Sequence, residues 1–114
     1  LQQVKAGKMK AIAVTGAQRS LLLPSLPTLA ESGVPGYEVN VWFGMQLPAG
    51  TPKLLVDKIN LDIARILREA DVVKLFRAQG VEVIASSPAA FAALVEGEVT
   101  KWTEVINGAN IKVE

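Results

Sequence analysis

The side chains that could do chemistry in this chain are serines, carboxylates and basic groups, because it contains no histidine and no cysteine. A nucleophilic serine needs a general base within hydrogen-bond reach, and histidine is the side chain most often used. Ser20, Ser86 and Ser87 therefore lack the usual partner. We place no catalytic residue and predict that the chain is not an enzyme.

The carboxylates do not form a recognisable metal site either. Most of them fall on helical faces beside lysine or arginine, which is typical of a solvated surface. Neither a calcium-binding loop nor a phosphate-cradling glycine pattern occurs. We therefore predict no metal and no cofactor. The carboxylates considered are Glu31, Glu38, Asp57, Asp62 and Glu69.

Length and charge set further limits. The 114 residues suffice for one domain at most, half of them are apolar, and the formal net charge is +1. So small a charge gives no electrostatic basis for binding nucleic acid or an anionic membrane surface. No apolar run is long enough to span a bilayer.

A segment rich in proline and glycine, residues 23–52, divides the chain. Thr28 and Glu31 have the spacing of a capping box, in which each side chain accepts a hydrogen bond from the backbone N–H of the other residue. We expect them to start a short helix. Pro35 and Gly36 predict a turn.

The remaining pattern predicts an α/β fold of strand, loop, strand and then helices. Caps are expected at Thr51, Asp71 and Ser87, the last followed by Pro88 at the first helical position. The predicted strands are Met9–Thr15, Val39–Leu47 and Val81–Ala85, the helices are Lys53–Glu69, Asp71–Gln79 and Pro88–Asn107, and Ile111–Val113 is a short extended tail. Gly44 indicates a bulge or a close approach of the backbone.

The apolar periodicity also predicts a core. These side chains recur on one face of each expected helix or strand, where they would be removed from water. The residues expected to be buried are Val14, Val41, Leu55, Ile59, Ile63, Ile66, Phe76, Phe91, Leu94 and Trp102.

Several consecutive stretches resemble one known family. LPSLPTLAESGVPGYE, VWFG and PAGTP follow one another between residues 23 and 52, KAGKMKAIAVTGAQRS precedes them, and AQGVEVIASSPAAFAALVEGEVTKW follows. Together they are similar to the periplasmic solute-binding receptors of tripartite tricarboxylate transporters, also called Bug-type receptors. The resemblance implies a two-lobed periplasmic-binding-protein fold of type II. It also implies that residues 1–114 are the C-terminal portion of a longer chain, with hinge strands and C-terminal helices.

The resemblance implies a function in transport. Such receptors capture a small carboxylate-bearing solute in the periplasm and deliver it to membrane transporter subunits. The expected partners are therefore a small organic acid and these subunits, with no nucleic acid. The expected location is the periplasm, with a signal peptide outside this chain. The principal anion-binding loops of the family precede the part that this chain matches.

Three residues are candidate ligand contacts on this resemblance. Trp42 or Phe43 would line the ligand cleft from a hinge strand, while the alternative is that both pack beneath a neighbouring helix. Arg19 would contact a ligand carboxylate, while the alternative is a structural pairing with Glu31 or a backbone carbonyl. The structural alternative is favoured in both cases.

A hypothesis of a different class is a stand-alone α/β interaction module that self-associates and has no role in transport. A receptor portion separated from its other strands would leave a sheet edge and apolar helix faces uncovered. The isolated chain is therefore expected to be a homo-oligomer, in which identical chains exchange an element across the loop Leu23–Gly36.

Overall fold

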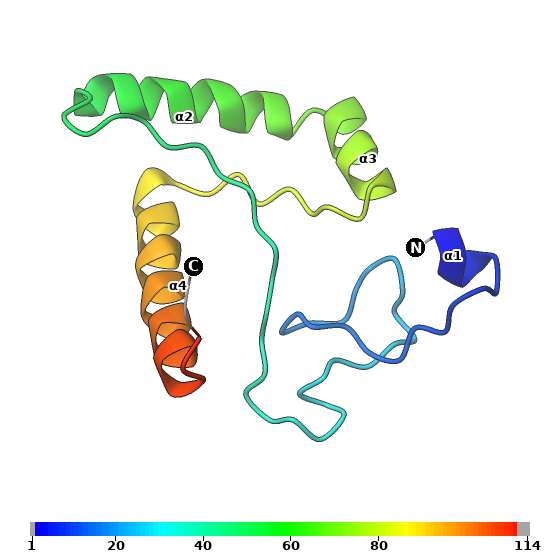
Figure 1. The fold of residues 1–114 in the computed structure, drawn as a ribbon. Coiled ribbons are helices and arrows are strands. Elements are labelled where there is room, and N and C mark those ends of the chain that lie inside the picture. Colours follow the sequence, from blue (N-terminus) through cyan, green and yellow to red (C-terminus); the bar gives the residue numbers. More distant parts are fainter. Residues whose placement is uncertain (1, 112–114) are drawn as a thin grey trace. The chain divides into compact units, whose positions relative to one another are not determined.

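The computed structural model describes residues 2–111 (Figure 1). The chain divides into two units, residues 1–43 and residues 44–114, which are described separately. The first contains the single-turn helix α1 (Gln2–Lys5). The second contains α2 (Lys53–Leu67), α3 (Ala70–Ala78) and α4 (Pro88–Gly108). The expected tail at 111–113 lies beyond the described residues except for Ile111.

Backbone pairing at Val14 organises the first unit. The Val14 N–H donates to the carbonyl of Pro27 and the Val14 carbonyl accepts from the N–H of Leu29, both at 2.9 Å. These two bonds make an isolated parallel bridge between Val14 and Thr28. Two distant parts of the sequence are therefore joined at one residue pair.

The next residue pairs on its other side. The carbonyl of Thr15 accepts a hydrogen bond of 2.8 Å from the N–H of Val39. Successive residues of an extended chain direct their backbone groups to opposite sides, so residues 14–15 lie between two other segments. The first unit thus holds the beginning of a three-segment sheet, each pairing being only one or two residues long.

The prediction of three strands is wrong. Among residues 2–111, the ranges Met9–Thr15, Val39–Leu47 and Val81–Ala85 form no strand, and the Val14 bridge is the pairing found. A strand needs a continuous ladder of hydrogen bonds with a neighbour, and two or three short segments seldom make a stable sheet alone. The short helix predicted after Thr28 is also wrong, since this segment forms turns.

The turn predicted at Pro35–Gly36 is confirmed. The N–H of Tyr37 donates to the carbonyl of Val34 at 3.1 Å. Gly36 has a φ of +77°, which suits the third position of a type II turn and disfavours any side chain there. The chain therefore reverses at this point before the segment that leads to Phe43.

The three helices predicted for the second unit are confirmed to within two residues at each end, whereas two of their three predicted caps are wrong. Ser87 caps α4 as expected, because its hydroxyl accepts from the N–H of Ala90 at 3.2 Å. Thr51 does not cap α2, since its hydroxyl donates to the carbonyl of Pro48 at 2.7 Å and so closes the preceding turn. The cap predicted at Asp71 is also wrong, because Glu69 occupies that position and Asp71 lies within the first turn of α3, where the helix dipole stabilises a carboxylate.

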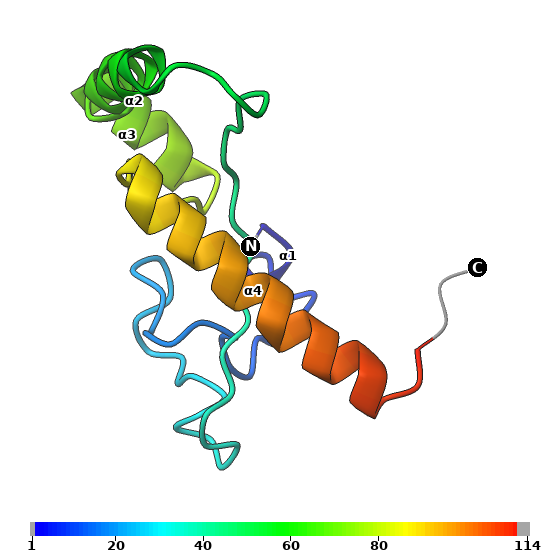
Figure 2. The same cartoon turned by 90° about the vertical axis from the view of Figure 1, so that its left-hand side faces the viewer.

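Helix α2 is the centre of the second unit, because it contacts both α3 and α4. Figures 1 and 2 show that α4 extends away from α2, so that only its beginning lies beside that helix. The connection between α3 and α4 returns along α2. There the side-chain amide of Asn60 donates to the carbonyl of Ser86 at 2.9 Å, and the Arg68 guanidinium approaches the carbonyl of Ala85 at 3.5 Å.

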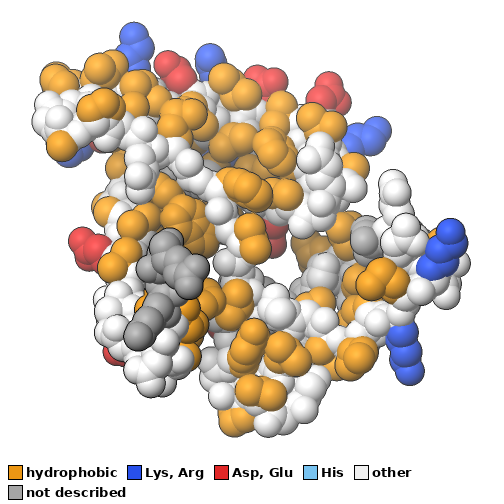
Figure 3. Space-filling view, viewed as in Figure 1, with side chains coloured by type: hydrophobic (Ala, Val, Ile, Leu, Met, Phe, Trp, Pro, Cys, Tyr) orange, Lys and Arg blue, Asp and Glu red, His pale blue; other side chains and the backbone are white. Residues whose placement is uncertain are grey.

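Much of the predicted core is exposed. Five residues expected inside are classed as exposed, namely Val41 (86%), Leu55 (47%), Ile66 (48%), Leu94 (42%) and Trp102 (39%), and the other five are half-buried. The helices have the predicted apolar faces, but within the described chain too little packs against them. Apolar side chains accordingly cover much of the surface in Figure 3.

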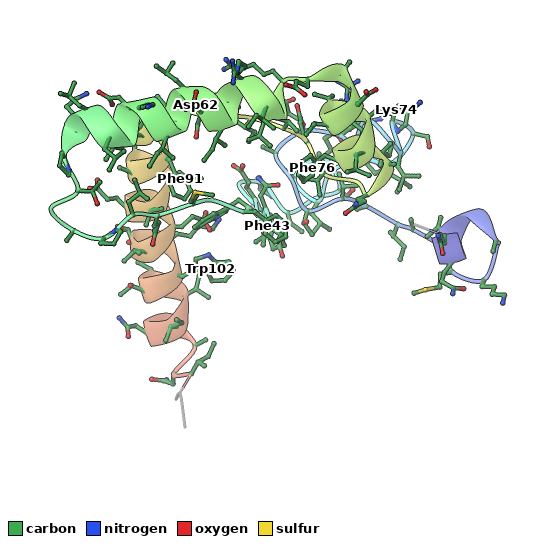
Figure 4. The ribbon with its side chains drawn as sticks, turned by 90° about the horizontal axis from the view of Figure 1, so that it is seen from above. Phe43, Asp62, Lys74, Phe76, Phe91 and Trp102 are labelled. Carbon is green, nitrogen blue, oxygen red and sulfur yellow. The ribbon has the colours of Figure 1, made fainter. Side chains whose placement is uncertain are left out.

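Two phenylalanines project from the helices of the second unit. Phe76 and Lys74 leave α3 on opposite sides, and Phe91 lies near the beginning of α4 (Figure 4). Phe91 also meets the backbone of Gly44, where a Cβ would overlap the end of the aromatic ring. The close approach predicted at Gly44 is therefore confirmed.

Two glycine substitutions test this packing. Gly44→Ala should lower the free energy of unfolding by about 1–3 kcal/mol, because the added methyl displaces the Phe91 ring. Gly97→Ala should raise it by about 0.5–1 kcal/mol, since Gly97 lies inside α4 with no atom near the added Cβ. Urea titration followed by helix circular dichroism measures both. Equal effects of the two substitutions would contradict the contact between Gly44 and Phe91.

Candidate functional site

Arg19 and Glu31 form the most connected polar cluster of the first unit. The Arg19 Nε donates to both carboxylate oxygens of Glu31, at 2.9 and 3.2 Å. The side chains are about half exposed, 48% for Arg19 and 46% for Glu31. The pairing that the sequence favoured for Arg19 is therefore confirmed. A ligand contact by the same side chain stays a prediction.

The same carboxylate belongs to the predicted capping box, which is also confirmed. The N–H of Thr28 donates to Glu31 Oε2 at 2.8 Å, and the N–H of Glu31 donates to the Thr28 hydroxyl at 3.1 Å. The hydroxyl of Ser32 donates in turn to the carbonyl of Thr28 at 2.7 Å. Thr28 is 3% exposed, so these bonds satisfy polar groups that water scarcely reaches.

The ionisation of Glu31 reflects these contacts. The hydrogen bond from Arg19 contributes most to lowering the pKa of the Glu31 carboxyl, and the hydrogen bond from the Thr28 N–H contributes next. Both stabilise the charged form of the carboxyl. Glu31 is therefore the anionic centre of a local network that joins two parts of the loop.

Trp42 and Phe43 lie in an extended segment at the end of the first unit. Trp42 is 37% exposed, whereas Phe43 is 82% exposed. Phe43 is the more accessible aromatic of the two for a binding role.

The second unit contains a depression where α2 and α4 begin. Its volume is about 490 Å³, and Lys53 and Asp57 at its edge form an ion pair with each other. A carboxylate on this wall, together with a lysine already paired, disfavours an anion. Sequence analysis did not anticipate this depression, because it is lined by two segments that lie far apart in the sequence, residues 51–57 and 87–89. The lining residues are Thr51, Lys53, Val56, Asp57, Ser87, Pro88 and Ala89.

Among the described residues, the hydrogen bonds of the Arg19 side chain go to Glu31 and do not join Arg19 to Trp42 or Phe43. Across the described range 2–111, no group of carboxylates is arranged to hold a metal ion. None of the helices described is both long and apolar enough to pass through a bilayer.

Known proteins match nearly the whole chain. The sequence profile described as "Tripartite tricarboxylate transporter family receptor" matches residues 1–111. The UPF0065 protein in the tcbD-tcbE intergenic region of Pseudomonas sp. strain P51 is 34% identical over 106 residues, which are 92% of this chain and 32% of that protein. The chain thus spans about a third of the length of this relative.

Solved structures match the fold as well. The periplasmic binding protein BugD is 38% identical with a TM-score of 0.81, over 99% of this chain and 38% of that one. The R. palustris protein Rpa4515, solved with adipate, is 37% identical with a TM-score of 0.78, over 96% of this chain and 36% of that one. The arrangement described above is therefore similar to part of a periplasmic binding protein.

Replacement of Thr28 tests the capping box. Thr28→Val keeps the shape of the side chain but removes the oxygen that accepts from the Glu31 N–H. Loss of a capping hydroxyl is worth about 1 kcal/mol, so exchange of the Glu31 amide hydrogen should accelerate about fivefold. Thr28→Ser is the matched control, since it retains the oxygen. An unchanged Glu31 exchange rate in Thr28→Val would show that the bond contributes nothing.

Proposed function

This chain belongs to the receptor family of tripartite tricarboxylate transporters, and we propose that it forms the C-terminal portion of a receptor that captures a small carboxylate-bearing solute. The observation that carries this proposal is its similarity over nearly its whole length to Rpa4515, a protein solved with adipate. The family is one of transport receptors and not of enzymes.

The proposed setting follows from the same relatives. BugD is a periplasmic binding protein, and we place the complete receptor in the periplasm, directed there by a signal peptide. Its fold would be the two-lobed type II arrangement, to which residues 1–114 contribute hinge segments and helices. The complete receptor would deliver its solute to the membrane subunits of the transporter.

The proposed ligand contacts within this chain are Phe43, Trp42 and Arg19. Phe43 has the support of its exposure, because an aromatic ring that is 82% accessible can pack against the carbon chain of a solute. Arg19 has the support of its guanidinium, whose Nε is held by Glu31 while the group remains half exposed. Arg19 would act as a weak contact, since the Glu31 charge opposes a second carboxylate.

Calorimetric titration with adipate tests whether the main contacts to the solute lie outside this chain. The 114-residue chain alone should show no saturable binding at micromolar concentrations, because the expected anion-binding loops lie outside it. The longer receptor should bind, and its thermal midpoint should rise with adipate or another small carboxylic acid. Micromolar affinity of the chain alone would contradict the assignment of the main contacts to the rest of the receptor.

Two variants of the longer receptor test the residues. Phe43→Ala should weaken binding about tenfold, or about 1.4 kcal/mol, and Arg19→Gln should weaken it less. Leu54→Ala is the control, because Leu54 is an equally exposed apolar residue on α2, at 86%. If Phe43→Ala and Leu54→Ala bind alike, Phe43 does not contact the solute.

Self-association is a second candidate function, and the exposed extended segment favours it. Along residues 41–47, Val41 (86%), Phe43 (82%) and Met45 (65%) alternate with other residues and are largely exposed. An exposed and extended apolar segment can pair with a second copy of itself. We infer that the isolated chain forms a symmetric dimer.

Light scattering distinguishes the two states of the isolated chain. The dimer should give twice the 12.1 kDa mass at tens of micromolar, and its thermal midpoint should rise with concentration. Val41→Lys and Phe43→Lys should shift it toward the monomer, while Leu54→Lys on α2 should not. A monomeric mass with a concentration-independent melt would falsify self-association and leave the receptor proposal intact.

A further inference from the structure

We propose that Glu31 is an acid-sensitive clasp, which keeps the loop between Arg19 and Glu31 closed while its carboxylate is charged and releases the loop when it is protonated. The loop begins at Arg19 and ends at Glu31, and these two residues are joined directly by hydrogen bonds. It contains Pro24 and Pro27, which hold their part of the backbone extended or turned.

The Glu31 carboxylate accepts hydrogen bonds from two donors at once. Toward the start of the loop it accepts from Arg19 Nε, and within the loop it accepts from the N–H of Thr28 at 2.8 Å. A charged carboxylate offers acceptor sites to both donors, whereas a protonated one carries a hydrogen on one oxygen and loses its charge-assisted bonds. One proton therefore weakens both attachments together.

Thr28 connects the Glu31 carboxylate, and therefore its protonation, to the backbone pairing of the first unit. It is 3% exposed and forms the bridge with Val14, flanked by the hydrogen bonds of Pro27 and Leu29 to the same residue. Loosening the capping box frees the segment that carries these bonds. The pairing of Val14 is thus expected to open along with the clasp.

The charged surroundings of Glu31 are simple. Among residues 2–111, Arg19 is the charged side chain that contacts it, and the other contacts are the backbone and hydroxyl of Thr28. Arg19 keeps its charge at every pH of interest. The clasp should therefore titrate as a single group.

The direction of the pH effect follows from the lowered pKa of Glu31, whose first cause is the Arg19 hydrogen bond. A carboxyl with a pKa that is lower in the folded than in the unfolded chain stabilises the fold at pH values above the unfolded pKa. This contribution is lost as the pH falls through the lower, folded value. The clasp should be closed near neutral pH and should open only as the pH falls below the usual titration range of glutamate.

Nuclear magnetic resonance of the 114-residue chain tests the clasp. The carboxyl carbon of Glu31 should titrate at lower pH in buffer than in concentrated urea, and amide exchange at Thr28 and Leu29, corrected for the intrinsic effect of pH, should accelerate at the same midpoint. Arg19→Gln should move the Glu31 midpoint upward while leaving the capping box able to form. Glu38→Gln is the matched control, because the Glu38 carboxylate accepts a hydrogen bond from the side chain of nearby Asn40 and does not contact the loop that Glu31 closes.

Glu31→Gln provides the second arm. Glutamine can still accept from the Thr28 N–H but does not titrate, so exchange at Thr28 and Leu29 should lose its additional acid dependence. A Glu31 midpoint equal in buffer and urea would overturn the proposal. It would also be overturned if the acid-induced acceleration persisted in Glu31→Gln with the wild-type midpoint.

Discussion

The pairing of Val14 with residues 27–29 is the interaction on which the first unit depends. Apart from this pairing and the bond between Thr15 and Val39, the hydrogen bonds among the described residues of this unit close local turns, cap a turn or join two side chains. Proline-rich loops cannot supply a regular ladder, because proline lacks a backbone donor. The capping box at Thr28 compensates for this by fixing the conformation of the segment that meets Val14. A buried threonine and an exposed ion pair thus act as one structural element.

The second unit depends on a different constraint, which is how much apolar surface α2 can cover. Ala64 on this helix is the buried apolar residue among those described, and α2 is the helix that touches both α3 and α4. The same helix carries Leu54 and Leu61, which are 86% and 70% exposed. Exposed apolar area of this extent is unusual for a soluble monomer. The chain matches about a third of the length of a longer relative.

The features that could be predicted from the sequence are those determined by neighbours along the chain. Helix α4 was predictable because Ser87 and Pro88 form a start signal that needs no distant partner. The capping box of Thr28 and Glu31 was predictable because its atoms are only three residues apart. The strands were not, because a residue such as Val41 becomes a strand residue only when another segment pairs with it. The wrong cap at Thr51 has a local cause, since its hydroxyl had a competing acceptor in the carbonyl of Pro48.

The candidate site shows the same difference between features set by sequence neighbours and features set by distant segments. The bond between Arg19 and Glu31 spans twelve residues, yet the opposite charges and the turns between them made it a reasonable expectation. The exposure of Phe43 was not predictable, because it depends on what covers the segment after Tyr37. The depression between the beginnings of α2 and α4 was likewise outside the reach of the sequence pattern, since it requires the crossing of the two helices.

The two tryptophans lie in different units, with Trp42 near the end of the first and Trp102 on α4 of the second. The indole N–H of Trp102 donates to Glu98 at 2.8 Å, and the ammonium of Lys101 lies 5.5 Å from the centre of its ring. Its emission spectrum therefore reports on the integrity of one turn of α4. The chain consequently contains a separate optical reporter for each unit, and single-tryptophan forms make it possible to follow their melting independently.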